Sequence, residues 1–153
     1  MPKRCFKISG NFRQYGGWST PDPGFIGYII VDDEGVFEGY MEEQYATRDP
    51  LRFVTGIFDE KYATKLAYYE LTASGQDTPL LFIFPDILKL GQFFVIDKDE
   101  YNKGGEAKVS LGLYTVDRGM LKRIQEIKKR IVGNGPVWNK DLASKASELR
   151  GSL

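Results

Sequence analysis

The residues that could perform chemistry in this chain are carboxylates, tyrosines and one cysteine, because the sequence contains no histidine. A serine–histidine–aspartate triad, a cysteine–histidine dyad and a histidine-bound zinc ion are therefore excluded. Cys5 is the only cysteine, so it can form neither an internal disulfide bond nor a cysteine zinc site. Phosphate-binding motifs of the GxxxxGK[ST] or GxGxxG type are missing as well. We therefore expect no cofactor and no metal ion.

Paired carboxylates remain as the basis for an enzyme. Glycoside hydrolysis or proton transfer needs two carboxyl groups that face one cavity and differ in pKa. Glu38, Glu70 and Asp86 lie in or at the ends of expected strands, but the pattern does not bring two of them into one cavity. The acidic runs at 32–34 and 97–100 do not have the spacing of an EF-hand loop. A carboxylate-based enzyme is therefore the third of three hypotheses, and the sequence leans against catalysis.

The elements that would position these groups are strands over the first three quarters of the chain. This part is rich in aromatic and β-branched residues and is interrupted by Gly, Pro, Asp and Asn, which is typical of strands joined by turns. Turns are expected at 32–35, 74–77 and 102–105. The expected strands span 5–12, 25–31, 36–43, 51–58, 65–72, 79–85, 91–97 and 106–115.

This pattern predicts a mainly β fold, an antiparallel up-and-down eight-stranded β-barrel over residues 1–116. Closure of the sheet removes the edges that a long antiparallel sheet would leave exposed, and a β-sandwich is the alternative. A barrel of eight strands is wide enough to be filled by side chains or to hold one small ligand.

The hairpin at 25–43 should have one face in the core and one mixed face. Turns of two or four residues give the same division of the faces, because both registers have the same parity. The predicted core face carries Ile26, Tyr28, Ile30, Phe37, Gly39 and Met41. The predicted outer face includes Ile29, Val31, Val36 and Tyr40, which need cover.

Residues 117–153 are predicted to form a helical extension that supplies this cover within a single domain. Asp117 is a good N-cap, and the helix that it begins should end near Gly133. The apolar stripe of this helix consists of Met120, Leu121, Ile124, Ile127 and Ile131. A second helix repeats the pattern with Leu142, Ala146 and Leu149. We expect one or both helices to pack on the outside of the barrel, although self-association could cover the same strip.

The charges are unevenly distributed along the chain. Residues 1–116 carry 12 Lys and Arg against 17 Asp and Glu, whereas residues 117–153 carry 9 against 4. The basic tail could contact nucleic acid or acidic lipid, but we favour its folding onto the acidic body, which itself argues against a nucleic-acid partner. No apolar run approaches the roughly 20 residues of a membrane span, and the start Met-Pro-Lys-Arg lacks the apolar stretch that we would expect of a secretory signal. A cytoplasmic location without membrane contact is expected.

Several motifs together resemble the avidin and streptavidin family. ISGNFRQ at 8–14 is similar to the first strand of that family, and the segments at 25–43 and 52–59 are similar to its second hairpin and its fourth strand. GQFFVID and GGEAKVSLGLYT resemble its late strands, so the similarity covers about residues 8–115. Lipocalins and fatty-acid-binding proteins share the same barrel plan.

The departures from this family concern its ligand. Phe12 occupies the place of the aromatic residue of the first motif, and Tyr68, Tyr69 and Leu90 stand near the places of the ligand-stacking tryptophans. The resemblance therefore implies a barrel fold, and biotin binding is not expected.

The first hypothesis is a non-catalytic barrel that binds a small, partly apolar molecule in its mouth. The candidate lining residues are Phe12, Trp18, Tyr28, Met41 and Arg52, with Arg52 as the polar anchor. The second hypothesis is a fully packed barrel that acts as a protein-interaction module or homo-oligomer through the mixed face around Ile29, Val36 and Tyr40.

Overall fold

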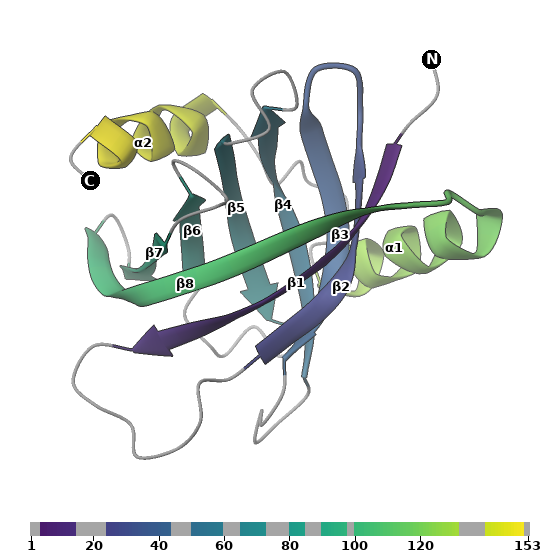
Figure 1. Cartoon of the computed structure of the whole chain (residues 1–153), viewed down its shortest axis with the longest axis horizontal. Helices are drawn as coiled ribbons and strands as arrows, with labels where there is room; N and C mark the ends of the chain where they lie inside the picture. The colour runs from purple at the N-terminus through teal and green to yellow at the C-terminus, as the bar shows by residue number, and fades with distance from the viewer. Residues whose placement is uncertain are drawn as a thin grey trace.

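The computed structural model describes residues 4–14, 24–43, 50–59, 65–72, 80–84, 90–97, 100–131 and 140–151. Within these ranges eight strands are followed by two helices (Figure 1). The strands are β1 (Arg4–Gln14), β2 (Gly24–Val31), β3 (Val36–Glu43), β4 (Leu51–Asp59), β5 (Lys65–Thr72), β6 (Leu80–Phe84), β7 (Gly91–Asp97) and β8 (Glu100–Tyr114). The helices are α1 (Arg118–Ile131) and α2 (Lys140–Gly151).

The strands pair in the order in which they follow one another along the chain. Each pairs antiparallel with the next, and β8 returns to pair with β1 over ten residues, from Cys5 opposite Tyr114 to Gln14 opposite Gly105. The prediction of a mainly β, antiparallel fold is confirmed. Figure 1 shows β8, β1 and β2 crossing in front of the strands β3 to β6.

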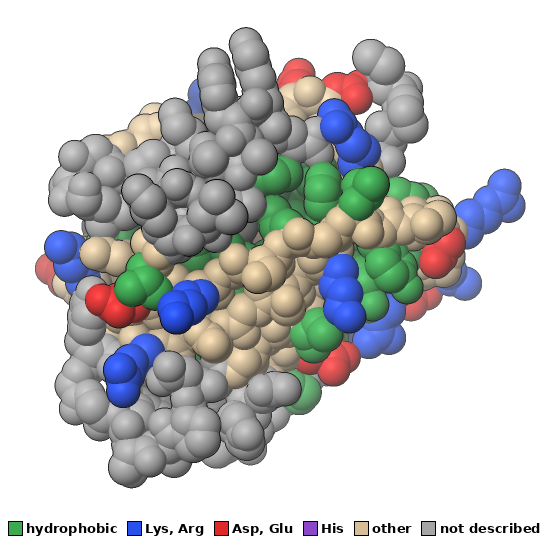
Figure 2. All heavy atoms as spheres, viewed as in Figure 1, with side chains coloured by type: hydrophobic (Ala, Val, Ile, Leu, Met, Phe, Trp, Pro, Cys, Tyr) green, Lys and Arg blue, Asp and Glu red, His purple; other side chains and the backbone are tan. Residues whose placement is uncertain are grey.

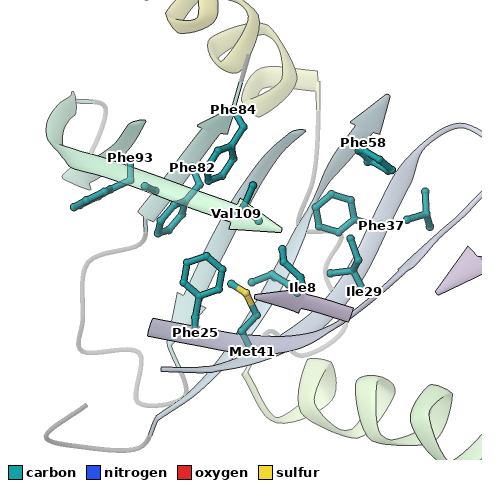
Figure 3. Close-up of a cluster of buried hydrophobic side chains, with 13 residues drawn as sticks. Ile8, Phe25, Ile29, Phe37, Met41, Phe58, Phe82, Phe84, Phe93 and Val109 are labelled. Carbon is teal, nitrogen blue, oxygen red and sulfur yellow. The ribbon is translucent and has the colours of Figure 1, made fainter. Parts of the chain in front are cut away.

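The inward side chains form a cluster of buried apolar residues (Figure 3). Side chains alternate between the two faces of a strand, so every second residue of each strand can enter this cluster. Its buried members are Ile8, Phe25, Ile29, Val31, Phe37, Met41, Val54, Phe58, Phe82, Phe84, Phe93, Ala107 and Val109. The strands therefore enclose a predominantly aromatic and aliphatic interior.

The β2–β3 hairpin has a loop of three residues in place of the predicted two or four. The Asp32 N–H donates to the Val36 carbonyl over 2.9 Å, and the Gly35 N–H donates to the Asp32 carbonyl over 3.1 Å. Gly35 adopts a φ of 84°, the left-handed conformation that closes such a loop and that glycine adopts without strain. The loop pairs Val31 with Phe37.

The predicted face of β2 is wrong because of this loop. A shift of one residue in register exchanges the two faces of a strand. Ile29 and Val31 belong to the interior cluster, whereas Tyr28 and Ile30 pack in a separate cluster with α1. The predicted face of β3 is correct, since Met41 is in the interior.

The turn expected at 102–105 is a β-bulge inside β8. Phe93 lies opposite Gly105 and Phe94 lies opposite Lys103, so Gly104 is the extra residue of the bulge. A Cβ atom on Gly104 would lie 2.3 Å from the Phe93 ring, and one on Gly105 would lie 1.9 Å from the Arg13 carbonyl oxygen. The two glycines allow a ring and a neighbouring strand to approach closely, and the chain does not turn there.

Helix α1 begins at the predicted cap. The Asp117 carboxylate accepts a hydrogen bond of 2.7 Å from the Met120 N–H, which satisfies one of the free donors of the first turn. All five residues of the predicted apolar stripe join one cluster, in which Ile124 and Ile127 are buried. The barrel contributes Cys5, Tyr28, Ile30, Tyr40, Leu51 and Phe53 to this cluster.

Charged groups complement the apolar contact between α1 and β3. Lys128 lies 2.5 Å from the Glu38 carboxylate, and Arg123 lies 3.5 Å from the Glu42 carboxylate. The Arg123 guanidinium also lies over the Tyr40 ring, 4.9 Å from its centre. The basic helix therefore neutralises acidic groups on the outer face of β3.

Helix α2 contacts the outer side of β6 and β7. Ala146 is buried together with Leu81, Ile83, Phe94 and Ile96, and Leu149 packs against the same group. The side chain of Leu142, the third residue of the predicted stripe, lies outside the described residues. Neither described helix has the length and apolar content needed to cross a membrane.

Candidate binding site at one end of the barrel

Four strands bring aromatic, apolar and charged side chains together at the end of the barrel where β1 leads toward β2 and β3 leads toward β4. Phe12 comes from the last part of β1, Phe25 from the start of β2, and Met41 from the last part of β3. Arg52, near the start of β4, lies directly opposite Met41. Cross-strand partners share a face of the sheet, so Arg52 faces the interior as Met41 does.

Phe12 and Phe25 belong to a group of four phenylalanine rings in the interior. Phe12 meets Phe82 and Phe93 edge to face, with ring centres 6.0 and 5.4 Å apart. Phe25 meets Phe82 at 6.2 Å, also edge to face, and the rings of Phe82 and Phe93 stack at 5.5 Å. Edge-to-face contacts are favourable for aromatic pairs because ring edges are positive and ring faces are negative. These rings form a rigid apolar wall.

Arg52 and Glu43 form an ion pair at the same end. The Arg52 guanidinium lies 3.3 Å from the Glu43 carboxylate, and the exposed fractions of the two side chains are only 8 and 11%. Arg52 also donates a hydrogen bond of 3.0 Å to the Leu51 carbonyl. Glu43 faces the interior because it lies opposite Phe25. The barrel therefore holds a buried guanidinium beside its apolar wall.

The structure brings three of the five predicted site residues to this end. Phe12, Met41 and Arg52 lie there as described. Tyr28 is on the outer side of β2, with its ring centre 6.0 Å from Tyr40 and 4.9 Å from Tyr114, so its predicted interior position is wrong. Trp18 lies outside the described residues.

Sequence reasoning missed Phe25, Glu43, Phe82 and Phe93. Phe25 was missed because the three-residue loop exchanges the two faces of β2. Glu43 lies on the face of β3 that was predicted correctly, but its pairing with Arg52 was not foreseen. The register that places Phe25 inside is indicated by one sequence signal, a glycine at position 35 after two aspartates and a glutamate.

The carboxylates considered for catalysis do not meet in the described part of the chain. Glu38 is paired with Lys128 on the outer side of β3. Asp86 and the side chain of Glu70 lie outside the described residues. Among the residues that were described, no three His, Cys, Asp or Glu side chains gather where they could bind a metal ion.

A separate pocket of about 230 Å³ lies between the β2–β3 hairpin and α1. It is lined by apolar side chains and by three polar ones, Asp32, Glu38 and Gln125. The Asp32 carboxylate accepts hydrogen bonds from the N–H groups of Glu34 and Val36, and Glu38 is held by Lys128. These carboxylates are thus part of the hairpin and of the helix contact.

Cys5 lies under α1 and its thiol donates to the Met120 sulfur over 3.1 Å. Burial, together with a smaller contribution from the Asp117 carboxylate, raises the pKa of the Cys5 thiol from 9.0 to about 11. A thiol that holds its proton in this way is a poor nucleophile. Cys5 therefore serves as a small apolar residue of the helix contact, as expected for a strand residue.

Comparison of the chain with protein-family models, with curated proteins and with solved structures finds no match. The resemblance to avidins stays a prediction, and the site has to be interpreted from its own geometry.

Proposed function

We propose that this chain is a non-catalytic binding protein, an eight-stranded barrel with both helices docked outside, and that it binds a small, partly apolar anion at the end that contains Arg52. The interior face of β1 to β4 supplies the apolar contact at this end, and the guanidinium supplies the polar anchor. Binding sites for small molecules have this composition, mostly apolar walls with a few placed polar groups.

The observation that carries the proposal is the buried guanidinium of Arg52. Moving a charged pair out of water costs more free energy than the attraction within an ordinary ion pair provides. A protein with apolar residues in place of the pair is therefore often equally stable or more stable. The pair between Arg52 and Glu43 is thus poorly explained by stability alone. A carboxylate or phosphate on a ligand would meet the planar donors of Arg52, which match such groups.

The self-association hypothesis has less support in the described residues. It required a mixed outer face around Ile29, Val36 and Tyr40. Ile29 is in the barrel interior, and Tyr40 packs in the cluster that includes α1. We keep the expected cytoplasmic location within the proposal.

Native mass spectrometry of freshly purified protein would test the proposal first, because it reports a retained ligand and the assembly state together. Isothermal titration with decanoate would follow, with decanol as the matched neutral probe. We expect decanoate to bind with one-to-one stoichiometry and decanol to bind at least about tenfold more weakly, which corresponds to about 1.4 kcal/mol.

The matched variants are Arg52→Met/Glu43→Leu, which removes both buried charges, and Arg123→Met, which removes an exposed guanidinium. The first should abolish the preference for decanoate and the second should leave it unchanged. A monomer that retains no ligand and binds neither probe would contradict the proposal. It would favour a barrel that is filled by its own side chains.

A further inference from the structure

The outer face of β8, β1 and the start of β2 carries a set of basic and small polar side chains. We call it the basic face. Because side chains alternate along a strand, the residues of the basic face point away from the interior cluster. They are Lys7, Ser9, Asn11 and Arg13 on β1, Glu106, Lys108, Ser110, Gly112 and Tyr114 on β8, and Ile26 on β2.

The basic face is open over most of its length. Lys7, Asn11, Arg13, Lys108, Ser110 and Gly112 are exposed. A Cβ atom added to Gly112 would meet no atom within 4 Å, so nothing in the described chain covers this position. Figure 2 shows this side of the molecule, with Lys and Arg side chains standing out from a surface of backbone and small side chains.

The register of β1 and β8 alternates basic and small residues across the face. Lys108 lies opposite Asn11, Ser9 lies opposite Ser110, and Lys7 lies opposite Gly112. Neighbouring residues on one face of a strand are about 7 Å apart. The lysines therefore flank a low strip of hydroxyl groups and backbone, over which an extended polymer could lie within reach of both ammonium groups.

Tyrosine rings border one end of the basic face. Tyr114 is 46% exposed, and its ring lies 4.9 Å from that of Tyr28, at an angle of 50°. Tyr28 in turn lies 6.0 Å from Tyr40, over which Arg123 is placed. Tyr114 thus presents an exposed ring that neighbouring aromatic groups support.

The fold places the acidic residues of β3 and of the β2–β3 loop away from this face. Glu38 and Glu42 lie on β3 and are paired with the basic helix α1. The acidic run at 32–34 lies in the β2–β3 loop. Glu106 is the one acidic residue among the described members of the basic face, where it lies directly opposite Arg13, so that Lys7, Arg13, Lys108 and Glu106 together carry a net charge of +2. The excess of acidic residues in residues 1–116 therefore does not describe the charge of this surface.

We propose that the basic face binds single-stranded nucleic acid. Proteins that bind single strands combine basic groups along the backbone with aromatic rings on which bases stack. Lys7, Arg13 and Lys108 supply the first element and Tyr114 supplies the second. The small residues Ser9, Ser110 and Gly112 let the polymer approach the sheet. The excess of acidic residues in 1–116 argued against a nucleic-acid partner, because that count treated residues 1–116 as a single surface. The proposal therefore reverses this expectation.

Fluorescence anisotropy with a labelled 12-nucleotide oligouridylate, measured between 50 and 200 mM salt, would test the proposal on the full chain. Each phosphate neutralised contributes about −0.7 to the slope of log affinity against log salt for a single strand. We expect a slope near −2 for the unchanged protein, and a slope smaller in magnitude by about 1.4 for Lys7→Gln/Lys108→Gln. Tyr114→Ala should weaken binding about tenfold, and Tyr114→Phe should retain it.

The matched control is Lys122→Gln/Lys129→Gln, which removes two exposed lysines from α1 and should leave both affinity and slope unchanged. Three outcomes would overturn the proposal: no binding, equal binding of polyglutamate, or affinity that is the same in Tyr114→Ala and Tyr114→Phe. Equal binding of polyglutamate would identify the face as a site for acidic polypeptides. Circular dichroism of each variant would verify that the strands are retained.

Discussion

At the scale of single residues, the Cys5 thiol links the stability of the helix contact to pH. The unfolded thiol has its ordinary pKa of 9.0, and the folded thiol keeps its proton to about 11. Unfolding therefore releases a proton between these two values, so the free energy of unfolding falls as the pH rises through this range. Below pH 9.0 the thiol is protonated in both states and has no such effect.

We expect this fall to be absent in Cys5→Ala, in which the titrating group is missing. Urea unfolding at several pH values from 8 to 11 would measure the difference between the two proteins, so that other groups titrating in this range cancel. If the free energy of unfolding depended on pH in the same way in both proteins, the Cys5 thiol would ionise equally easily in the folded and unfolded states.

Arg52 and Glu43 should depend on each other energetically. Removal of one partner of a buried pair leaves an uncompensated charge, which costs about 3–5 kcal/mol, whereas apolar replacement of both is often neutral. Arg52→Met is therefore expected to lower the free energy of unfolding strongly, and Arg52→Met/Glu43→Leu to restore most of it. Denaturant unfolding of the two single variants and the double variant gives the coupling energy, and additive losses would argue against coupling.

At the scale of elements, Gly35 determines which face of β2 enters the barrel. Its φ of 84° is costly for other residues by about 1–2 kcal/mol, and a Cβ atom there would lie 2.5 Å from the Phe58 carbonyl oxygen. Gly35→Ala should lower the free energy of unfolding by at least this amount. The control is Gly112→Ala, for which we expect no change or a gain of up to about 1 kcal/mol. Thermal unfolding of both variants makes the comparison, and equal melting temperatures would contradict it.

The docking of α1 depends on its buried isoleucines. Ile124 is buried against the barrel, so Ile124→Ala should cost about 2–5 kcal/mol through lost burial and a cavity. Lys122 is exposed on the other side of the helix, and Lys122→Ala should change the free energy of unfolding by less than about 0.5 kcal/mol. Chemical denaturation measures both, and a negligible cost for Ile124→Ala would indicate that the helix is not docked in solution.

The hairpin also shows where sequence reasoning reaches its limit. The alternation of residues in β2 and β3 predicts two faces, but both carry large apolar side chains, so hydrophobicity does not choose between them. The choice depends on whether the loop has an odd or even number of residues. Tyr28 was placed in the interior because a loop with an even number of residues was assumed, and Phe25 was overlooked for the same reason.

At the scale of the whole molecule, the distribution of elements could be predicted because each strand and helix has a strong local pattern. The stripe of α1 predicts its buried face. The alternation from Ala107 to Leu113 predicts the inward face of β8 as far as Leu111, but it is wrong at Leu113, which is 76% exposed. Partners across the fold could not be predicted this way. The pairing of Arg52 with Glu43, and of Lys128 with Glu38, depends on register and on the placement of a helix, which no short window of sequence contains.

The barrel and its helices should be interdependent. A chain truncated after Val116 would expose the side chains that α1 covers, among them Ile30 and Phe53. Exposed apolar patches of this kind drive association. We expect the truncated chain to melt at a lower temperature and to form oligomers at concentrations at which the full chain is monomeric. Analytical ultracentrifugation checks this, and an equally stable monomer would contradict the docking of the helices.

The pairing of β1 with β8 constrains how the protein is made. The first strand can find β2 soon after leaving the ribosome, but its other edge has no partner until residues near 114 have been synthesised. Until then the nascent chain presents an open strand edge, to which another unfinished copy could pair. The rate of synthesis and the density of ribosomes on the messenger should thus affect the yield of native protein.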